Sequence, residues 1–366
     1  MRKSGVDRIL LLLVLIIAFG GFIIFLSASL GTLSRDIGGF ENAALKQLFA
    51  GLFVGGPLLF FFSRTNYRLL RRYAFFILFF ALLLTAAVFI PGLGTSHGGA
   101  TRWLEFMGVS FQPAELLKLA FVIYLSAWLS GVREKVRDFK YGLLPFILIS
   151  AVSGFILILQ PDIDGLLILI AAGLVVFFAA GAPLKHMASV LLFGIVASGI
   201  LFYTSDYLSA RLTTFIDPGS SDLRAEGYQV NQSLIAIGSG GALGRGFGRS
   251  LQKFQYLPEP TGDSIFATFA EEWGFAGTSI LVTSFLLLAL RGLYVAMRST
   301  DTFGRLLAVG IISLMFVQSS INVASMLGLF PLSGTTLLFI SQGGTALALA
   351  LAEAGILLSV SRRTSV

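Results

Sequence analysis

Residues 9–30, ILLLLVLIIAFGGFIIFLSASL, decide the fold class, because they form an unbroken apolar run without a charged side chain. A helix of about 20 such residues crosses the hydrocarbon core of a bilayer. Nine further apolar blocks follow, and the predicted spans are 9–30, 44–62, 73–90, 112–130, 143–160, 164–182, 187–203, 275–296, 306–327 and 338–360. The sequence therefore predicts an all-α integral membrane protein with about ten transmembrane helices, in a single polytopic domain over residues 1–366.

Composition and charge support this class and exclude others. The chain is 56% hydrophobic and 12% charged, whereas soluble domains are about 25% charged. The net charge of +7 comes from short basic clusters between apolar blocks, which argues against a nucleic-acid partner. Cytoplasmic loops of membrane proteins are rich in Lys and Arg. We therefore expect the basic clusters to lie on the cytoplasmic side, and these are 2–8, 64–72, 133–140, 291–305 and 362–363. This orientation predicts that both termini are cytoplasmic. The first block is predicted to be a retained helix.

The same topology places a long loop, residues 204–274, outside the membrane. Connections of this length are uncommon unless they are functional or disordered, and aromatic residues such as Phe215, Tyr228 and Phe254 favour order. We expect amphipathic helices at the outer interface, joined by the glycine-rich stretch 238–248, GSGGALGRGFG. That stretch lacks the Gly-Lys-Ser/Thr ending of a phosphate-binding loop, so tight turns are favoured over a nucleotide site.

Charged residues inside or beside the spans are the candidates for function, because burying them in a membrane is costly. Glu115 and Lys118 are three apart and share a helix face, either as a structural ion pair or as part of a functional cavity. Asp162 and Asp164 follow Gln160-Pro161 at an outer turn. They are either helix caps or a carboxylate pair for a divalent cation or another cationic group.

Four further acids, Glu259, Asp263, Glu271 and Glu272, precede the eighth apolar block. One of them, partly desolvated and near a cation such as Arg211 or Lys118, could act as a general base on a hydroxyl group. The alternative is that they favour the dipole at a helix N-terminus. The chain has no Cys and only two His, so neither a thiol nucleophile nor a Cys or His metal cluster is predicted.

Several strings in a fixed order resemble the SEDS family, the shape, elongation, division and sporulation proteins that include RodA and FtsW. They are GATRWL (99–104), FQPAELLK (111–118), QPD (160–162), GYQVNQS (227–233), LPE (257–259), DSIF (263–266), EE (271–272) and FISQGG (339–344). The sequence departs from the family at 261–264, which reads TGDS in place of HTDF, and at 341–344, which reads SQGG in place of SYGG. The tail 355–362 looks more like FtsW than RodA, which favours division over elongation.

The resemblance implies a glycosyltransferase of the bacterial cytoplasmic (inner) membrane that polymerises lipid II, the undecaprenyl-linked disaccharide peptide, on the outer face. It also implies a class B penicillin-binding transpeptidase as partner. Asp263 falls on the family's essential aspartate, and the other expected cavity or substrate-binding residues are Arg102, Glu115, Lys118, Asp162, Arg211, Gln232, Ser233, Glu259 and Ser341. Whether a divalent cation such as Mg²⁺ or Mn²⁺ takes part stays open.

Two other functions fit the same sequence. A lipid II flippase would use a polar path through Glu115 and Lys118, but it predicts acids on both sides of the membrane midplane. A scaffold of the division machinery would need neither the Glu115 and Lys118 pair nor the acid cluster. The acids concentrate near the outer mouth, so the sequence favours the enzyme.

Overall fold

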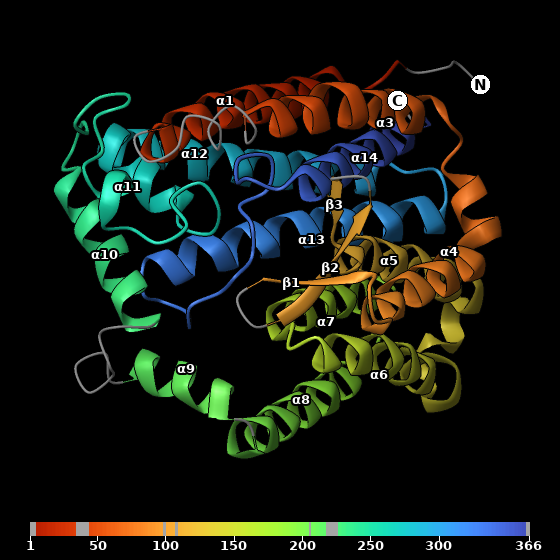
Figure 1. The fold of residues 1–366 in the computed structure, drawn as a ribbon. Helices are drawn as coiled ribbons and strands as arrows, with labels where there is room; N and C mark the ends of the chain where they lie inside the picture. The colour runs from red at the N-terminus through yellow and green to blue at the C-terminus, as the bar shows by residue number, and fades with distance from the viewer. Residues whose placement is uncertain are drawn as a thin grey trace.

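The computed structural model describes residues 5–33, 44–97, 100–106, 109–204, 206–216 and 226–363. Figure 1 shows a bundle of long helices with a small β-sheet attached to it. The main helices are α1 (Arg8–Leu33), α3 (Gly56–Arg64), α4 (Arg68–Ala86), α5 (Pro113–Val132), α6 (Leu144–Leu159), α7 (Ile163–Ala179), α8 (Leu184–Thr204), α12 (Ile265–Met297), α13 (Thr302–Met326) and α14 (Gly344–Ser361). Short helical turns, η1 (Phe49–Gly55), η2 (Ala87–Phe89), η3 (Arg133–Arg137) and η4 (Phe139–Leu143), adjoin them.

Every predicted apolar block overlaps a helix, although the tenth, 338–360, begins six residues too early because 338–343 form turns and loop before α14. Within the described ranges, eight helices are long and apolar enough to cross a membrane, and η1 and α3 belong to one of them, Ala44–Arg64. Two shorter apolar helices, Ile163–Ala179 and Leu184–Gly199, occupy the sixth and seventh predicted spans. The prediction of a helical multi-pass membrane protein is confirmed, while the number of helices that cross and their orientation stay predictions.

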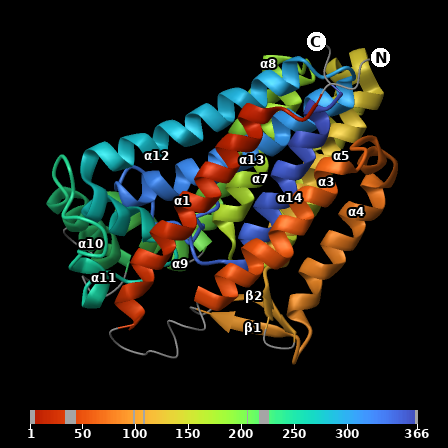
Figure 2. The same ribbon diagram turned by 90° about the horizontal axis from the view of Figure 1, so that it is seen from above.

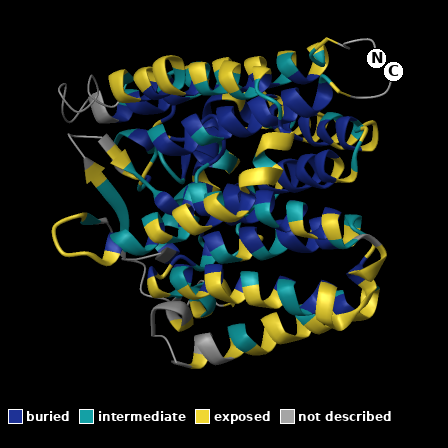
Figure 3. Ribbon diagram, turned by 90° about the vertical axis from the view of Figure 1, so that its right-hand side faces the viewer, coloured by how far each residue is buried: buried dark blue, intermediate teal, exposed yellow. Residues whose placement is uncertain are grey.

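The core of the bundle forms around α13, which packs against α5, α7 and α12, while α14 packs against α3. Figure 3 shows buried residues gathered inside the bundle and exposed ones on the outer faces of the peripheral helices. On α4 the exposed side chains are large and apolar, as with Phe75, Phe76 and Phe79. A wide apolar face of this kind suits lipid contact, so burial and exposure both follow from the bilayer as solvent.

A three-stranded antiparallel sheet lies between α4 and α5 in the sequence, and the all-α prediction missed it. Its strands are β1 (Gly94–His97), β2 (Ala100–Phe106) and β3 (Val109–Phe111), in the order β1-β2-β3. Leu104 pairs with Gly94 on one side and with Phe111 on the other. The strands are short and lie between two strongly apolar blocks, so the hydropathy pattern gave no separate signal for them.

The long loop is ordered helix over much of its described length, as expected. It contains α9 (Asp206–Ile216), α10 (Glu226–Ser239) and α11 (Gln252–Gln255). Figure 2 shows α10, α11 and the sheet at one end of the bundle and both chain termini at the other. This separation agrees with the predicted topology, in which the loop and the termini face opposite sides of the membrane.

The glycine-rich stretch 238–248 packs against α12 and forms tight turns. The sequence predicted tight turns here in preference to a nucleotide site. α12 is broken at Gly274, whose φ of 61° is a left-handed conformation that favours glycine. A Cβ at Gly274 would lie 2.3 Å from the Gly244 nitrogen, so the loop backbone needs glycine there. At the break, the Phe275 N–H donates to the Gly241 carbonyl at 2.8 Å and the Arg245 N–H donates to the Glu271 carbonyl at 3.0 Å. The loop thus satisfies backbone groups that the kink leaves without helical partners.

Candidate functional site

Asp263 lies in a tight turn immediately before α12, and neighbouring elements hold the turn in place. On α13, the Asn322 Nδ2 donates to the Asp263 carbonyl oxygen at 2.9 Å. The Ser341 hydroxyl donates to the Gly262 carbonyl at 2.8 Å. On the α10 side, the Gln229 amide donates to the hydroxyl of the next residue, Ser264, at 2.9 Å. Polar contacts from α10, α13 and the loop before α14 therefore fix the position of the backbone that carries the Asp263 side chain.

A second carboxylate, Asp164 at the start of α7, lies on the other side of Gly334. Its Oδ2 accepts from the Gly334 N–H at 3.2 Å and from the Arg211 Nη1 at 3.4 Å. A Cβ added to Gly334 would lie 3.6 Å from the Asp263 Oδ2, so Gly334 borders both carboxylates. The structure thus brings together Asp164, Arg211 and Asp263, which are far apart in the sequence.

Arg102, on strand β2, contacts the turn just before Asp164 and so borders the cluster of Asp164, Arg211 and Asp263, which we call the charged mouth. Its Nε donates to the Gln160 carbonyl at 3.0 Å, and its Nη2 donates to the Pro161 carbonyl. The adjoining Asp162 is buried and caps α7, because its Oδ1 accepts from the Gly165 N–H at 3.1 Å. The sequence left two roles open for Asp162 and Asp164, helix caps or a carboxylate pair for a cation. Asp162 is a helix cap, whereas Asp164 belongs to the charged mouth.

The environment of Asp263 favours a carboxylate that exchanges its proton near neutral pH. Removal from water raises the pKa of Asp263 to about 7, and the negative charges of Glu259 and Asp164 act in the same direction. The cations Arg211 and Arg102 oppose this rise in pKa without cancelling it. A general base works best when its pKa lies near the working pH, so this group suits proton abstraction from a hydroxyl.

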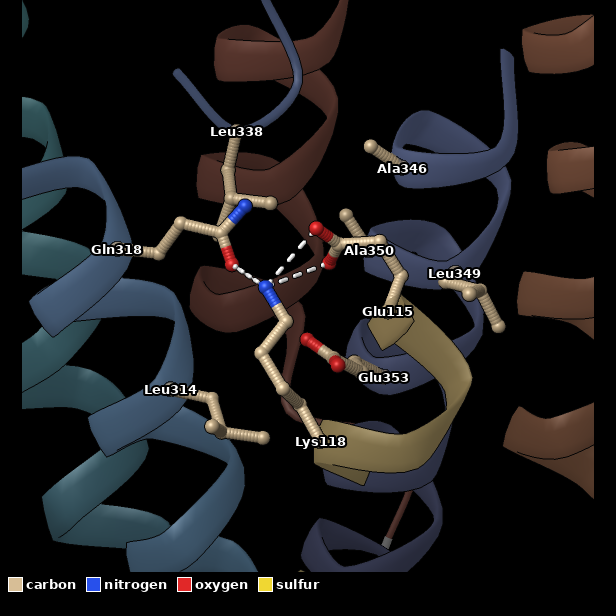
Figure 4. Close-up of a pocket in the computed structure, with 9 residues that line it drawn as sticks. All are labelled: Glu115, Lys118, Leu314, Gln318, Leu338, Ala346, Leu349, Ala350 and Glu353. Atoms are coloured by element: carbon tan, nitrogen blue, oxygen red, sulfur yellow. Dashed lines mark hydrogen bonds and ion pairs between the residues drawn. The ribbon is translucent and has the colours of Figure 1, made fainter. Parts of the chain in front are cut away.

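Glu115 and Lys118 form the expected ion pair inside the bundle (Figure 4). The Lys118 Nζ lies 2.9 Å from each of the two Glu115 carboxylate oxygens. It also donates to the Gln318 Oε1 on α13 at 2.7 Å. Glu353 of α14 lines the same small cavity. The pair is therefore part of a larger polar cluster that three helices build.

The polar cluster and the Asp263 turn are linked through α13 and the loop that follows it. Gln318 and Asn322 are four residues apart on α13 and so lie on one face. Gln318 donates through Nε2 to the Thr336 hydroxyl at 3.3 Å, and Asn322 donates to the Thr335 carbonyl at 2.8 Å. A change in the cluster can thus reach the Asp263 turn through adjoining contacts.

Glu271 and Glu272 do not join Asp263 at the mouth, so the expectation of four acids there is wrong for these two. Glu272 is buried and pairs with the Lys253 Nζ at 2.6 Å. Glu271 accepts from the Ser250 hydroxyl at 2.6 Å and from the Leu251 N–H at 3.1 Å. Both acids lie on the first turns of α12, where helical geometry directs them toward the loop and α1. They stabilise the fold around α11.

The remaining predicted site residues differ in their surroundings. Ser341 holds the turn that carries Asp263, and Glu259 is exposed in that turn. Ser233 is buried in α10 and contacts the Met326 sulfur at 3.4 Å, while Gln232 is half-buried on the same helix. It is Gln229, one turn earlier, that contacts the Asp263 turn.

Sequence reasoning missed four residues of these clusters, namely Gln229, Gln318, Asn322 and Glu353. Gln318 and Asn322 are a polar pair at helical spacing inside an apolar block, which is a readable signal. Glu353 is a charge inside the tenth predicted span, so the criterion applied to Glu115 would also have found it. Gln229 lies in the string GYQVNQS (227–233), from which Gln232 and Ser233 were chosen instead.

Within the described ranges, no group of three or more His, Asp or Glu residues converges as a set of metal ligands. Mg²⁺ is often held by only one or two carboxylates together with water and substrate phosphates. The expectation about a divalent cation therefore stays open.

Comparison with known proteins gives consistent matches over nearly the whole chain. The sequence pattern of the FtsW/RodA/SpoVE family, described as cell cycle protein, matches residues 7–366. The probable peptidoglycan glycosyltransferase FtsW of Geobacter sp. (strain M18) is 35% identical, covering 99% of this chain and 98% of the relative. Stage V sporulation protein E of Bacillus subtilis (strain 168) is 34% identical with the same coverage.

Solved structures show the same architecture. A chain from a peptidoglycan synthase complex, studied for the coordination of polymerization and crosslinking, matches with a TM-score of 0.81 and 28% identity, over 98% of both chains. The rod shape determining protein RodA of Thermus thermophilus matches with a TM-score of 0.72 and 29% identity, over 99% of this chain and 98% of RodA.

Proposed function

Because the chain belongs to the FtsW/RodA/SpoVE family of cell cycle proteins, we propose that it is a peptidoglycan glycosyltransferase that extends glycan strands at the Asp263 site. Relatives at about 35% identity over their full length carry this activity in their names. The observation that supports Asp263 most is its position across Gly334 from the Asp164 and Arg211 ion pair, where burial raises the pKa of its carboxyl group to about 7. A carboxylate with this pKa can take a proton at neutral pH and release it again.

In the proposed reaction, a sugar hydroxyl of one lipid-linked chain attacks the anomeric carbon of another. The bond from that carbon to the pyrophosphate oxygen breaks, and Asp263 accepts the proton of the attacking hydroxyl. The lipid pyrophosphate leaves with the bonding electron pair. Arg211 and Arg102 raise the positive potential of the mouth and so favour the negative charge of the leaving group.

Asp164 has a separate role in this proposal. Its carboxylate holds the Arg211 guanidinium at 3.4 Å and keeps negative charge next to Asp263, which helps to raise the pKa of that base. Should a divalent cation bind, Asp164 and substrate oxygens would be its ligands, and the ion would supply further positive charge beside the pyrophosphate.

The natural substrate is proposed to be lipid II, and the site of action the outer face of the bacterial cytoplasmic membrane. A multi-pass membrane fold suits a substrate whose lipid stays in the bilayer. A class B penicillin-binding transpeptidase is the proposed partner, because a structural relative belongs to a complex that couples polymerization to crosslinking.

Polymerisation of labelled lipid II by the purified chain, with and without a transpeptidase partner, tests the proposal. Asp263→Asn keeps the shape of the side chain but cannot accept the proton, so polymerisation should fall about 10²- to 10⁴-fold. Glu105→Gln is the matched control, because it removes an exposed acid of the sheet. If Asp263→Asn protein polymerises lipid II within a few-fold of the parent, the assignment of Asp263 as base is wrong.

A further inference from the structure

Glu353 is an acid in the middle of α14 whose carboxyl group is enclosed by protein. Its residue is 7% exposed, and it lines a cavity of about 10 Å³, which is room for about one water molecule. Figure 4 shows the carboxyl group directed toward the Lys118 ammonium. Ala346 and Ala350 lie on the same face of α14, and their small side chains leave the space that the carboxyl group occupies.

Lys118 does not supply the hydrogen bond that an ionised Glu353 would need. An ammonium group has three N–H donors. The Lys118 Nζ has three acceptors within 2.9 Å, which are the two carboxylate oxygens of Glu115 and the Oε1 of Gln318. The donors of Lys118 are thus matched without Glu353.

The charge balance of the cavity leads to the same conclusion. Among the described residues that line it, the charged groups are Glu115 and Lys118 from α5 and Glu353 from α14. The residues from α13 and the following loop, Leu314, Gln318 and Leu338, are uncharged. Two ionised acids with one cation would leave a net negative charge inside the bundle, and an uncompensated buried charge is strongly disfavoured. One acid must hold a proton, and Glu115 already has the cation.

We propose that Glu353 completes a buried proton-binding site with Glu115 and Lys118, in which Glu353 is the neutral acid and one water in the cavity joins its carboxyl group to the pair. Glu353 is a positioning residue that acts through Lys118. When its proton is lost to solvent, the new carboxylate competes with Glu115 and Gln318 for the ammonium group. Gln318 contacts Thr336 in the loop before α14, so the proton on Glu353 is coupled to the loop that borders Asp263.

We infer the protonation of Glu353 from the geometry of the cavity, whereas its expected effect on catalysis rests on the proposed polymerase activity. Two measurements separate these parts. Infrared spectroscopy of the purified full-length protein detects the C=O stretch of a neutral carboxylic acid. Activity as a function of pH detects the consequence for the reaction.

The infrared measurement is best made with Asp263→Asn protein near pH 7, because this substitution removes an acid outside the cavity whose pKa of about 7 would add a neutral-acid band of its own. Adding Glu353→Gln should remove one neutral-acid band from the spectrum. Adding Glu134→Gln, which removes an exposed acid of η3, should leave the band unchanged. If Glu353→Gln removes carboxylate absorption instead, Glu353 is ionised and the proposal is overturned.

The activity measurement compares the parent with Glu353→Gln, whose neutral amide imitates the protonated acid. At neutral pH the two should polymerise lipid II within about 2-fold of each other. At alkaline pH the parent should lose activity, and Glu353→Gln should keep it; Glu353→Met, also uncharged, serves if the glutamine variant does not fold. Superimposable pH profiles would overturn the positioning role. Absence of polymerisation by the parent itself would refute the proposed function and leave the infrared result to decide the proton site.

Discussion

Removing a negative charge and removing a positive charge near Asp263 should shift the acid limb of the profile of activity against pH in opposite directions. Glu259→Gln removes a negative charge that helps to raise the pKa of Asp263, so the limb should move to lower pH. Arg211→Gln removes a cation that lowers this pKa, so the limb should move to higher pH. A structural defect would lower activity at every pH and would leave the position of the limb unchanged.

The magnitude follows from the pKa of about 7. At about pH 6 roughly 9% of the Asp263 carboxyls are ionised, and at about pH 8 roughly 91%, so the parent rate should rise about 10-fold between these values. Burial is the largest cause of the raised pKa and remains in Glu259→Gln protein, so the limb should stay above the ordinary range of an aspartate. Glu259 is exposed, so added salt should weaken its effect.

Initial rates of lipid II polymerisation at saturating and at low substrate, over this pH range, measure the effect. Glu105→Gln again serves as a control for removing an exposed acid. Limbs that shift in the same direction in Glu259→Gln and Arg211→Gln, or that do not move, would refute the reasoning that Asp263 is the titrating base.

Stability gives an independent check on the same pKa. The folded-state pKa of Asp263 is above the value of an unfolded aspartate, so its contribution to stability is present in acid and is lost as pH rises through about 7. Asp263→Asn cannot ionise and should lose this part of the pH dependence. The unfolding temperature of the variant should therefore rise relative to that of the parent on going from about pH 5 to about pH 8.

Further predictions concern the buried ion pairs and the topology. Lys118→Met should lower the free energy of unfolding by about 3 to 5 kcal/mol, the cost of breaking a fully buried pair, and Glu115→Gln should cost less because Glu353 can then ionise and pair with Lys118. The double variant should lose less than the sum of the two, and strict additivity in detergent unfolding measurements would show that the residues do not interact. Lys253→Met should cost a similar free energy, because its side chain is fully buried against an acid, and a loss under about 1 kcal/mol would contradict this. Because the chain has no Cys, Leu243→Cys should react with an impermeant thiol reagent in intact spheroplasts, and Glu134→Cys only after lysis; the reverse pattern would show that the predicted orientation is wrong.

The helices and their order could be predicted from the sequence, because the signal for a span is local. A block such as 9–30 is apolar over the length that a helix needs to cross a bilayer, whatever packs beside it. The glycine-rich stretch was also correctly predicted as tight turns. The sheet was missed because its strands are short and lie between two dominant apolar blocks.

Which charges meet was decided only by the tertiary structure. Asp263, Asp164 and Arg211 come from different elements, and no spacing rule connects them. Glu272 is one of four acids close together in sequence, yet helical geometry turns it toward Lys253 and away from Asp263. Local hydropathy decides that a segment becomes a helix in lipid, because each residue partitions largely on its own polarity. The partners of a buried charge depend on how helices distant in sequence pack, because only that packing sets the distances over which charges and hydrogen bonds act.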